Sequence, residues 1–254
     1  VAYDYDSRYF AEFNFGYNGS ENFAPDNRFG FFPSVGLGWA VSNEKWFEPA
    51  SKVINFMKLR ATWGKVGNAK ITGRRFAYLA TIQNKGNYTF GQNGDQSFSG
   101  LEIGEEAVDV SWETAHKWNL GLDINTLGNA LSLHADVFYD MREGIFLSRG
   151  DLPWYVGMTN MPLGNLGKAK NKGFEVSAEY KKQFNDDWFL SLMANCSFNR
   201  NEVVDNDVRY AYPWLDVRGQ RVGQRYGYIA EKLFDSDEEV AASAYQSGDT
   251  RAGD

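Results

Sequence analysis

Two histidines and the carboxylates near them are the residues whose types could support catalysis or metal binding. His116 and His134 are the only histidines of the chain, and neither is accompanied by a cysteine or a carboxylate cluster at the spacing of metal ligands. A Ser-His-Asp hydrolase would use His134 with Asp123 or Asp136, but nothing in the sequence singles out a serine. We therefore expect no catalytic residue, no metal site and no cofactor, and we predict that the protein is not an enzyme.

Aromatic residues in two long polar segments are better candidates for binding. Sugars stack their apolar faces on aromatic rings, while neighbouring amides and carboxylates bond to the hydroxyl groups. On this basis we expect the ligand-binding residues to be Trp154, Tyr155, Asn160, Tyr210, Tyr212, Trp214 and Asp216. The alternative is that these rings pack the two segments together or against a protein partner.

An acidic run near the C-terminus admits two interpretations. The run 235–239 (DSDEE) offers oxygen ligands for calcium but lacks the glycine and the spacing of an EF-hand loop. Ser236 followed three residues later by Glu239 is typical of a capping box. We favour this second interpretation, which predicts a short helix from Asp237 to about Tyr245.

The composition favours a chain of many strands and argues against some partners. Aromatic residues make up 16% of the 254 residues, with 26 glycines and 6 prolines, which suits strands joined by polar turns. The net charge of −7 argues against nucleic acid as a partner. No run approaches the roughly 20 apolar residues of a spanning helix. The mean hydropathy of −0.49 remains compatible with barrel strands, because their two faces alternate.

Strict alternation of apolar and polar residues is the dominant pattern. It is clearest at 112–125, where one face carries Trp112, Thr114, His116, Trp118, Leu120, Leu122 and Ile124. A second example is 188–199, where Phe189 and Met193 interrupt the polar face and Cys196, an inert small hydrophobe in our interpretation, lies on the apolar one. The pattern predicts about eight strands, most long enough to cross a bilayer with the ~10 residues that a tilted strand needs.

Short and long connections alternate along the chain. The short ones are 6–7, 127–130 and 185–187, together with 43–55, a compact segment suited to a short helix. The long polar ones are 19–29, 66–111, 148–165 and everything after 205. Short periplasmic turns and long outer loops are the rule for outer-membrane barrels. The alternatives are a soluble carbohydrate-binding β-sandwich, or a small closed outer-membrane barrel that acts as an adhesin or porin.

Several stretches carry a more specific resemblance. Residues 27–39 (NRFGFFPSVGLGW) and 56–68 (FMKLRATWGKVGN) are similar to the strand motifs R-Y/F-G-x-F-P-S-x-S-x-G-W and L-K-L-R-A-S-Y/W-G-x-x-G-N. Residues 112–123, 165–175 (NLGKAKNKGFE) and 223–228 (GQRYGY) match three later motifs in the same order. The chain thus resembles the barrel region of the SusC/RagA-like TonB-dependent outer-membrane transporters of Bacteroidetes. One departure is 108–111 (VDVS), where that family usually has an Asn-Pro-x-Leu/Ile approach.

The resemblance implies an all-β fold, an antiparallel transmembrane β-barrel of about 22 strands with a plugged lumen. Residues 1–254 are then part of one barrel domain, and we expect the plug domain and the closing C-terminal strands to lie outside them. It also implies a TonB-energised importer of a bulky nutrient, which is a glycan oligosaccharide or sometimes a peptide. Such a protein is located in the bacterial outer membrane, where its outer surface contacts lipid. The implied partners are a SusD-like surface lipoprotein and the TonB complex.

Overall fold

The computed structural model describes residues 1–71, 75–105, 107–151, 155, 161–227, 229, 232–244 and 250–253. The chain divides into two compact units, Val1–Val222 and Gly223–Asp254. Among the described residues, the first unit contains the strands and the second contains a short helix. No helix in these ranges is long and apolar enough to cross a membrane.

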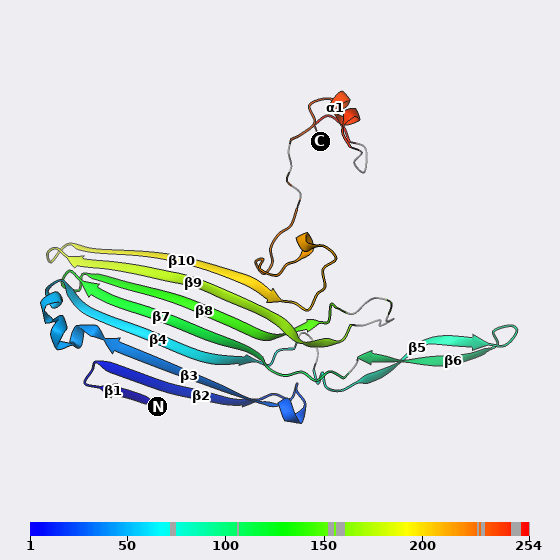
Figure 1. Cartoon of the computed structure of the whole chain (residues 1–254), viewed down its shortest axis with the longest axis horizontal. Helices are drawn as coiled ribbons and strands as arrows, with labels where there is room; N and C mark the ends of the chain where they lie inside the picture. The colour runs from blue at the N-terminus through cyan, green and yellow to red at the C-terminus, as the bar shows by residue number, and fades with distance from the viewer. Residues whose placement is uncertain are drawn as a thin grey trace. The chain divides into compact units, whose positions relative to one another are not determined.

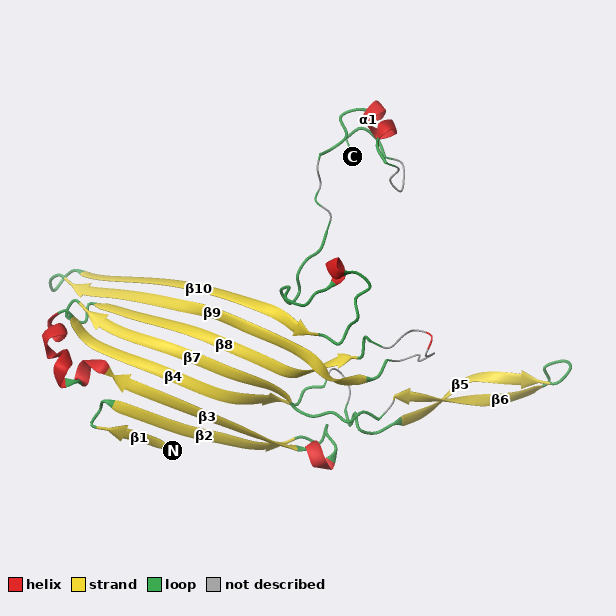
Figure 2. Ribbon diagram, viewed as in Figure 1, coloured by secondary structure: helices red, strands yellow, loops and turns green. Residues whose placement is uncertain are grey.

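Eight strands of the first unit form one antiparallel sheet (Figures 1 and 2). They are β1 (Ala2–Tyr5), β2 (Tyr9–Gly19), β3 (Phe29–Ala40), β4 (Ile54–Asn68), β7 (Glu113–Thr126), β8 (Leu131–Ser148), β9 (Leu163–Gln183) and β10 (Phe189–Asp205). Their order in the sheet is their order in the sequence. A separate hairpin, β5 (Thr81–Phe90) and β6 (Gln96–Glu105), is inserted between β4 and β7.

The register of the sheet places residues of like polarity side by side. One row across five strands consists of Ala61, Leu120, Val137, Phe174 and Phe198. The adjacent row consists of Arg60, Gly121, Asp136, Glu175 and Ser197. Because successive side chains of a strand point to opposite sides, the first row belongs to an apolar face of the sheet and the second to a polar face. The predicted alternation is confirmed, and so is the predicted number of about eight strands for this sheet.

The apolar face is uncovered. On it, Leu120 is 65% exposed, Val137 59% and Phe198 52%. The buried apolar side chains lie instead in the connections and at the end of β3, namely Phe23, Ala40, Val41, Phe47, Ile71, Ala77 and Val110. A soluble β-sandwich covers such a face with a second sheet, and in the described part of the chain no second sheet does so. A large uncovered apolar surface is typical of contact with lipid or with another protein surface.

Aromatic rings flank the aliphatic part of the apolar face. Near the short turns, Tyr9 stacks on Trp39 with ring centroids 6.5 Å apart. Toward the long connections, Trp63 and Trp118 lie 6.0 Å apart. Two aromatic rows with an aliphatic band between them form the pattern of the interfacial girdles of membrane barrels.

The short connections lie at one end of the sheet, on the left of Figure 1, and the long connections at the other end. Asp6 and Ser7 make the β1–β2 turn with positive φ values of 55° and 51°, the geometry favoured in two-residue hairpins. Two 3-10 helices, η2 (Val41–Asn43) and η3 (Lys45–Lys52), form the compact connection from β3 to β4. The predicted alternation of short and long connections, including this helical one, is confirmed.

Glu44, between η2 and η3, joins this connection to the sheet. Its carboxylate accepts hydrogen bonds from the Tyr9 hydroxyl at 2.6 Å and from the Trp39 indole N–H at 3.0 Å. It also lies 3.3 Å from the guanidinium of Arg8. The two hydrogen bonds and the positive charge of Arg8 hold the pKa of Glu44 below its ordinary value.

We expect acid to weaken this end of the sheet. A carboxylate with a lowered pKa in the folded state stabilises the fold above the unfolded pKa of about 4.3, and the stabilisation is lost as the pH falls through the folded value. The urea midpoint of the full-length protein should therefore fall as the pH drops below the unfolded pKa of Glu44, and less steeply in Glu44→Gln. Glu48→Gln, at an exposed position of η3, is the control. Equal pH profiles for wild type and Glu44→Gln would contradict this role.

The predicted polar connection 66–111 contains the β5–β6 hairpin, which the sequence did not reveal. Tyr88 pairs with Phe98, and the rings of Phe90 and Phe98 lie 5.8 Å apart. The strands are rich in Asn, Gln, Ser and Gly, and a shift of register between Asn84 and Asn87 interrupts the period. These two properties hide the alternation on which the other strands were predicted.

A small apolar cluster organises the long connections at their base. It consists of Phe23, Ile71, Ala77 and Val110, with Trp112 packed against it. Trp112 was predicted to lie on the apolar strand face, and this is wrong. The residue precedes β7, and its ring lies 5.3 Å from the ring of Phe23 and 5.1 Å from that of Phe32.

Aromatic rings on the polar face lie opposite glycines. Phe138 is paired with Gly173 of β9, and Phe10 with Gly38 of β3. A Cβ atom at Gly173 would lie 2.7 Å from the Phe138 ring and 2.2 Å from the carbonyl oxygen of Phe198. Each ring thus covers the backbone that its glycine leaves bare, an arrangement known as aromatic rescue. This explains why Phe138 interrupts the polar face.

The second unit contains α1 (Asp237–Ala242). Ser236 is its N-cap and accepts a hydrogen bond from the backbone N–H of Glu239 at 3.3 Å, so the predicted helix start is confirmed. The helix ends at Ala242, before the predicted end at Tyr245, which lies outside the described residues. The Glu239 carboxylate accepts from the backbone N–H of Asp235 at 3.0 Å, one residue earlier than in a standard capping box.

Candidate functional site

The connection after β10 folds back on that strand and presents an aromatic pair. The backbone N–H of Val203 donates to the carbonyl of Gln220 at 2.9 Å, and the N–H of Gly219 donates to the carbonyl of Val203 at 2.8 Å. In the segment between Val203 and Gly219, the rings of Tyr212 and Trp214 stack with centroids 4.6 Å apart and 7° between their planes. They are 52% and 72% exposed, so the pair offers an aromatic surface for stacking.

Asp216 is held by a neighbouring cation. The Arg218 guanidinium donates to both of its carboxylate oxygens, with the shortest contact at 2.6 Å, and the Arg218 backbone N–H donates at 2.9 Å. These hydrogen bonds and the positive charge lower the pKa of Asp216. The guanidinium carbon also lies 5.9 Å from the ring centre of Tyr210, whose hydroxyl accepts from the Asn206 amide at 2.6 Å. The side chains of Tyr210 and Asp216 are therefore engaged in contacts that stabilise the loop.

The structure links this connection to the loop between β8 and β9. Gly150 and Val208 form an isolated parallel bridge, and the Arg149 N–H donates to the Pro162 carbonyl at 2.8 Å across the base of the loop. Of the predicted binding residues here, Tyr155 is 73% exposed. Trp154 and Asn160 lie outside the described residues.

A charged cluster that the sequence did not predict lies on the polar face. Arg60 of β4 donates to Asp123 of β7 at 2.8 and 3.0 Å, and to Asp136 of β8 at 3.2 Å. Gly121 stands between them in the register, and a Cβ atom there would lie 2.6 Å from the guanidinium. The missing side chain is what allows Arg60 to reach across β7. His134 adds a 2.9 Å contact from its Nδ1 to Asp123.

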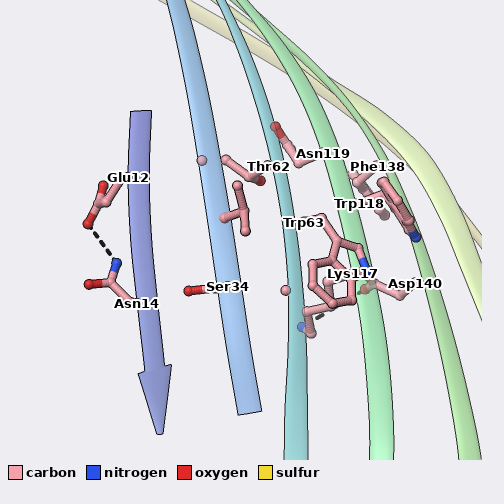
Figure 3. Close-up of a pocket in the computed structure, with 13 residues that line it drawn as sticks. Glu12, Asn14, Ser34, Thr62, Trp63, Lys117, Trp118, Asn119, Phe138 and Asp140 are labelled. Carbon is pink, nitrogen blue, oxygen red and sulfur yellow. Dashed lines mark hydrogen bonds and ion pairs between the residues drawn. The ribbon is translucent and has the colours of Figure 1, made fainter. Parts of the chain in front are cut away.

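The polar face is hollowed in several places, and two of these hollows share Lys117 and Asp140 in their linings. One has a volume of about 420 Å³ and a floor of small residues, with Glu12 and Asn14 on one side and Lys117 and Asp140 on the other (Figure 3). The second is a groove of about 580 Å³ nearer the long connections, lined in part by Lys117, Asp140, Asn171, Asn199, Asn201 and Asn206. Amide and charged groups in these hollows both donate and accept hydrogen bonds, as a ligand rich in hydroxyl or peptide groups requires.

His116 lies on the apolar face, with its ring 6.3 Å from that of Trp63. Cys196 is exposed on the same face, opposite Val176, as predicted. Within the described ranges, no three His, Cys, Asp or Glu side chains are grouped in a way that suits a metal ion.

The family model described as "TonB dependent receptor-like, beta-barrel" matches residues 1–248. The chain belongs to this family. TonB-dependent receptors are transport proteins of the outer membrane and not enzymes. The apolar face of this receptor barrel is accordingly its lipid side and the polar face its lumenal side.

Relatives of the receptor cover most of this chain. TonB-dependent receptor P3 of Formosa agariphila is 30% identical over 267 residues, which span 100% of this chain and 26% of P3. TonB-dependent receptor SusC of Bacteroides thetaiotaomicron is 29% identical over 198 residues, 78% of this chain and 19% of SusC. The RagAB peptide transporter has a similar structure, with a TM-score of 0.65, 26% identity, and coverage of 80% of this chain and 21% of the other. The chain thus spans about a quarter or less of these relatives.

Proposed function

We propose that this chain forms part of the barrel wall of a TonB-dependent importer for a bulky nutrient, a glycan oligosaccharide or a peptide. The observation that carries the proposal is the sheet itself, with an uncovered apolar face, a polar face with hollows, and all long connections at one end. This is the arrangement of an outer-membrane barrel with a wet lumen and large outer loops. The similarity to the RagAB peptide transporter supports the transport role.

The rest of the machinery is proposed to lie in the full-length protein and its partners. Residues 1–254 form part of a single barrel domain of about 22 strands, whose plug and closing strands come from other parts of the protein. A SusD-like surface lipoprotein covers the outer mouth, and the TonB complex supplies energy from the periplasmic side. The likeness to SusC and RagAB supports these partners.

The two alternative functions fit the structure less well. A soluble carbohydrate-binding β-sandwich would cover the apolar face, which is exposed in the described part of the chain. A small closed barrel would pair its first and last strands, whereas β1 and β10 are at the two edges of an open sheet.

The outer aromatic pair is proposed as a binding element. Tyr212 and Trp214 present exposed ring surface, and the groove lined by Asn171, Asn199 and Asn201 begins near the same end of the sheet. Stacking on the rings and hydrogen bonds to the amides together favour an oligosaccharide over a peptide. Tyr155, Tyr210 and Asp216 are further candidates for this site, and Trp154 and Asn160, which lie outside the described residues, stay predictions.

The test uses the full-length protein in its own cells. Deletion of the gene should abolish growth on one class of glycans or peptides, and growth on every member of such a panel would refute the importer proposal. With the substrate identified, the double variant Tyr212→Ala/Trp214→Ala should weaken its binding by about tenfold, the effect of losing roughly 1.4 kcal/mol of stacking. Leu215→Ala, in the same exposed turn, is the control and should bind normally.

A further inference from the structure

Toward the long connections, the apolar face of the sheet contains basic residues. On β9, the residues of this face toward the long connections are Val176, Phe174, Lys172 and Lys170, and their partners on β10 are Cys196, Phe198, Arg200 and Glu202. The rows extend across the sheet. One contains Trp63, Trp118, Tyr139, Lys172 and Arg200, and the next contains Lys65, His116, Met141, Lys170 and Glu202. We call Lys65, Lys170, Lys172 and Arg200 the basic band.

The basic band carries more positive than negative charge. Glu202 is the carboxylate in these two rows, and it is shared by Lys170 at 2.8 Å and Arg200 at 3.1 Å. Lys65 and Lys172 form no ion pair with any residue that the structure describes. Four cations and one carboxylate leave an excess of three positive charges in these two rows. The next row outward adds Lys168 and Glu143, which pair with each other at 3.3 Å and leave this excess unchanged.

The band begins in the outer aromatic row, because Lys172 and Arg200 share a row with Trp63, Trp118 and Tyr139. On β9 and β10 the next row inward contains Phe174 and Phe198, whose ring centroids are 6.0 Å apart. Aromatic girdles mark the boundary between hydrocarbon and headgroups, so the band is at the level of the outer-leaflet headgroups. The opposite end of the apolar face is different. There β9 presents Lys182 alone, opposite Leu190. On β9 the excess of cations is therefore at the outer end.

We propose that the basic band binds the phosphate groups of an anionic lipid of the outer leaflet, whose acyl chains lie along the aliphatic and aromatic rows below it. Lysine ammonium groups bind phosphate as point charges and the Arg200 guanidinium binds it through two N–H groups. The charge complements the headgroup, and the continuous apolar rows complement the chains, so one amphiphilic ligand satisfies both parts of the surface. The inference rests on the proposed barrel, because it requires this face to meet lipid.

The test measures lipid retention by the full-length protein in phosphatidylcholine nanodiscs. These contain either bisphosphorylated lipid A or the same lipid without phosphates, and bound lipid is counted by native mass spectrometry. Wild type should retain the phosphorylated form. Lys172→Gln/Arg200→Gln should weaken its retention by about 30-fold, since each basic residue near a membrane surface contributes about fivefold in affinity for anionic lipid. Lys182→Gln, on the same strand and face but at the other end, should not change it.

Three outcomes would overturn the inference. Equal retention of both lipids would show that the phosphates are not recognised. If millimolar inorganic phosphate displaced the phosphorylated lipid, the band would be a site for a soluble anion and not for a lipid. Loss of the co-purified surface lipoprotein in Lys172→Gln/Arg200→Gln, with lipid retention unchanged, would assign the band to a protein interface. Heat-modifiable migration of each variant confirms that a barrel has formed, so a failure of the proposed barrel is distinguishable from a failure of lipid binding.

Discussion

Replacing Gly173 with alanine should destabilise the barrel by about 3 kcal/mol, a loss typical of a side chain forced into a packed site. The new Cβ atom would lie 2.2 Å from the carbonyl oxygen of Phe198 and 3.0 Å from the Cα atom of Asn199. Both obstacles are backbone of β10, which cannot turn aside as a flexible side chain can. β9 and β10 must therefore separate locally, with loss of hydrogen bonds between them. The measurements are the urea midpoint of the full-length protein in detergent and the fraction that becomes heat-modifiable in the outer membrane.

Gly36→Ala is the matched control for this variant. Gly36 is on the polar face of β3, and a Cβ atom there would meet its nearest neighbours, Glu12 and Thr62, at 3.8 Å. This is ordinary contact, and alanine also costs less conformational entropy than glycine on folding. Its urea midpoint should be equal to that of wild type or slightly higher. If Gly173→Ala unfolded at the same urea concentration as Gly36→Ala, the close approach of β9 to β10 would not constrain the fold.

Replacing Arg60 with methionine should lower the free energy of unfolding by about 2 kcal/mol. Asp123 and Asp136 then lose the cation that they share, and both are mostly shielded from water, with side chains 16% and 23% exposed. The two carboxylates would repel each other across Gly121. Unfolding in urea at neutral pH, with methionine preserving most of the aliphatic packing of arginine, measures the effect.

Arg142→Met provides the comparison on the same face. Arg142 is 59% exposed and contacts Glu113 at 3.3 Å, so we expect its loss to cost less than about 1 kcal/mol. Adding Asp136→Asn to Arg60→Met should restore part of the stability, because it removes one of the two stranded charges. Additive effects of these two substitutions would contradict a coupled cluster.

The strands of the sheet could be predicted because their signal is local. At 118–124 and 131–141 every second residue is apolar. Phe138, which interrupts the polar face, is explained by Gly173 on the neighbouring strand. The start of α1 was predictable for the same reason, since Ser236 and Glu239 are three residues apart. In both cases the pattern that predicts the element is carried by residues close together in the sequence.

The rest depends on residues that are distant in the sequence. Phe23, Ile71, Ala77 and Val110 come from three different connections and form one cluster. No periodic pattern of apolar residues within any one connection predicts this cluster. Arg60 meets Asp136 only because β4, β7 and β8 are in one register and Gly121 leaves room. The aromatic residues after β10 were predicted as a group, and the structure stacks Tyr212 on Trp214 but engages Asp216 with Arg218.

The fold-back after β10 also bears on how a neighbouring strand is added. Val203 directs its N–H and carbonyl away from β9, toward Gly219 and Gln220, so the outer end of this edge of β10 is occupied. In the proposed barrel, a further strand would therefore pair with the stretch between Phe189 and Glu202. A slip of one residue in a strand would turn every lumenal side chain toward lipid. In the proposed barrel, the fold-back would block one end of this edge and so limit the alignments at which a further strand can pair with β10.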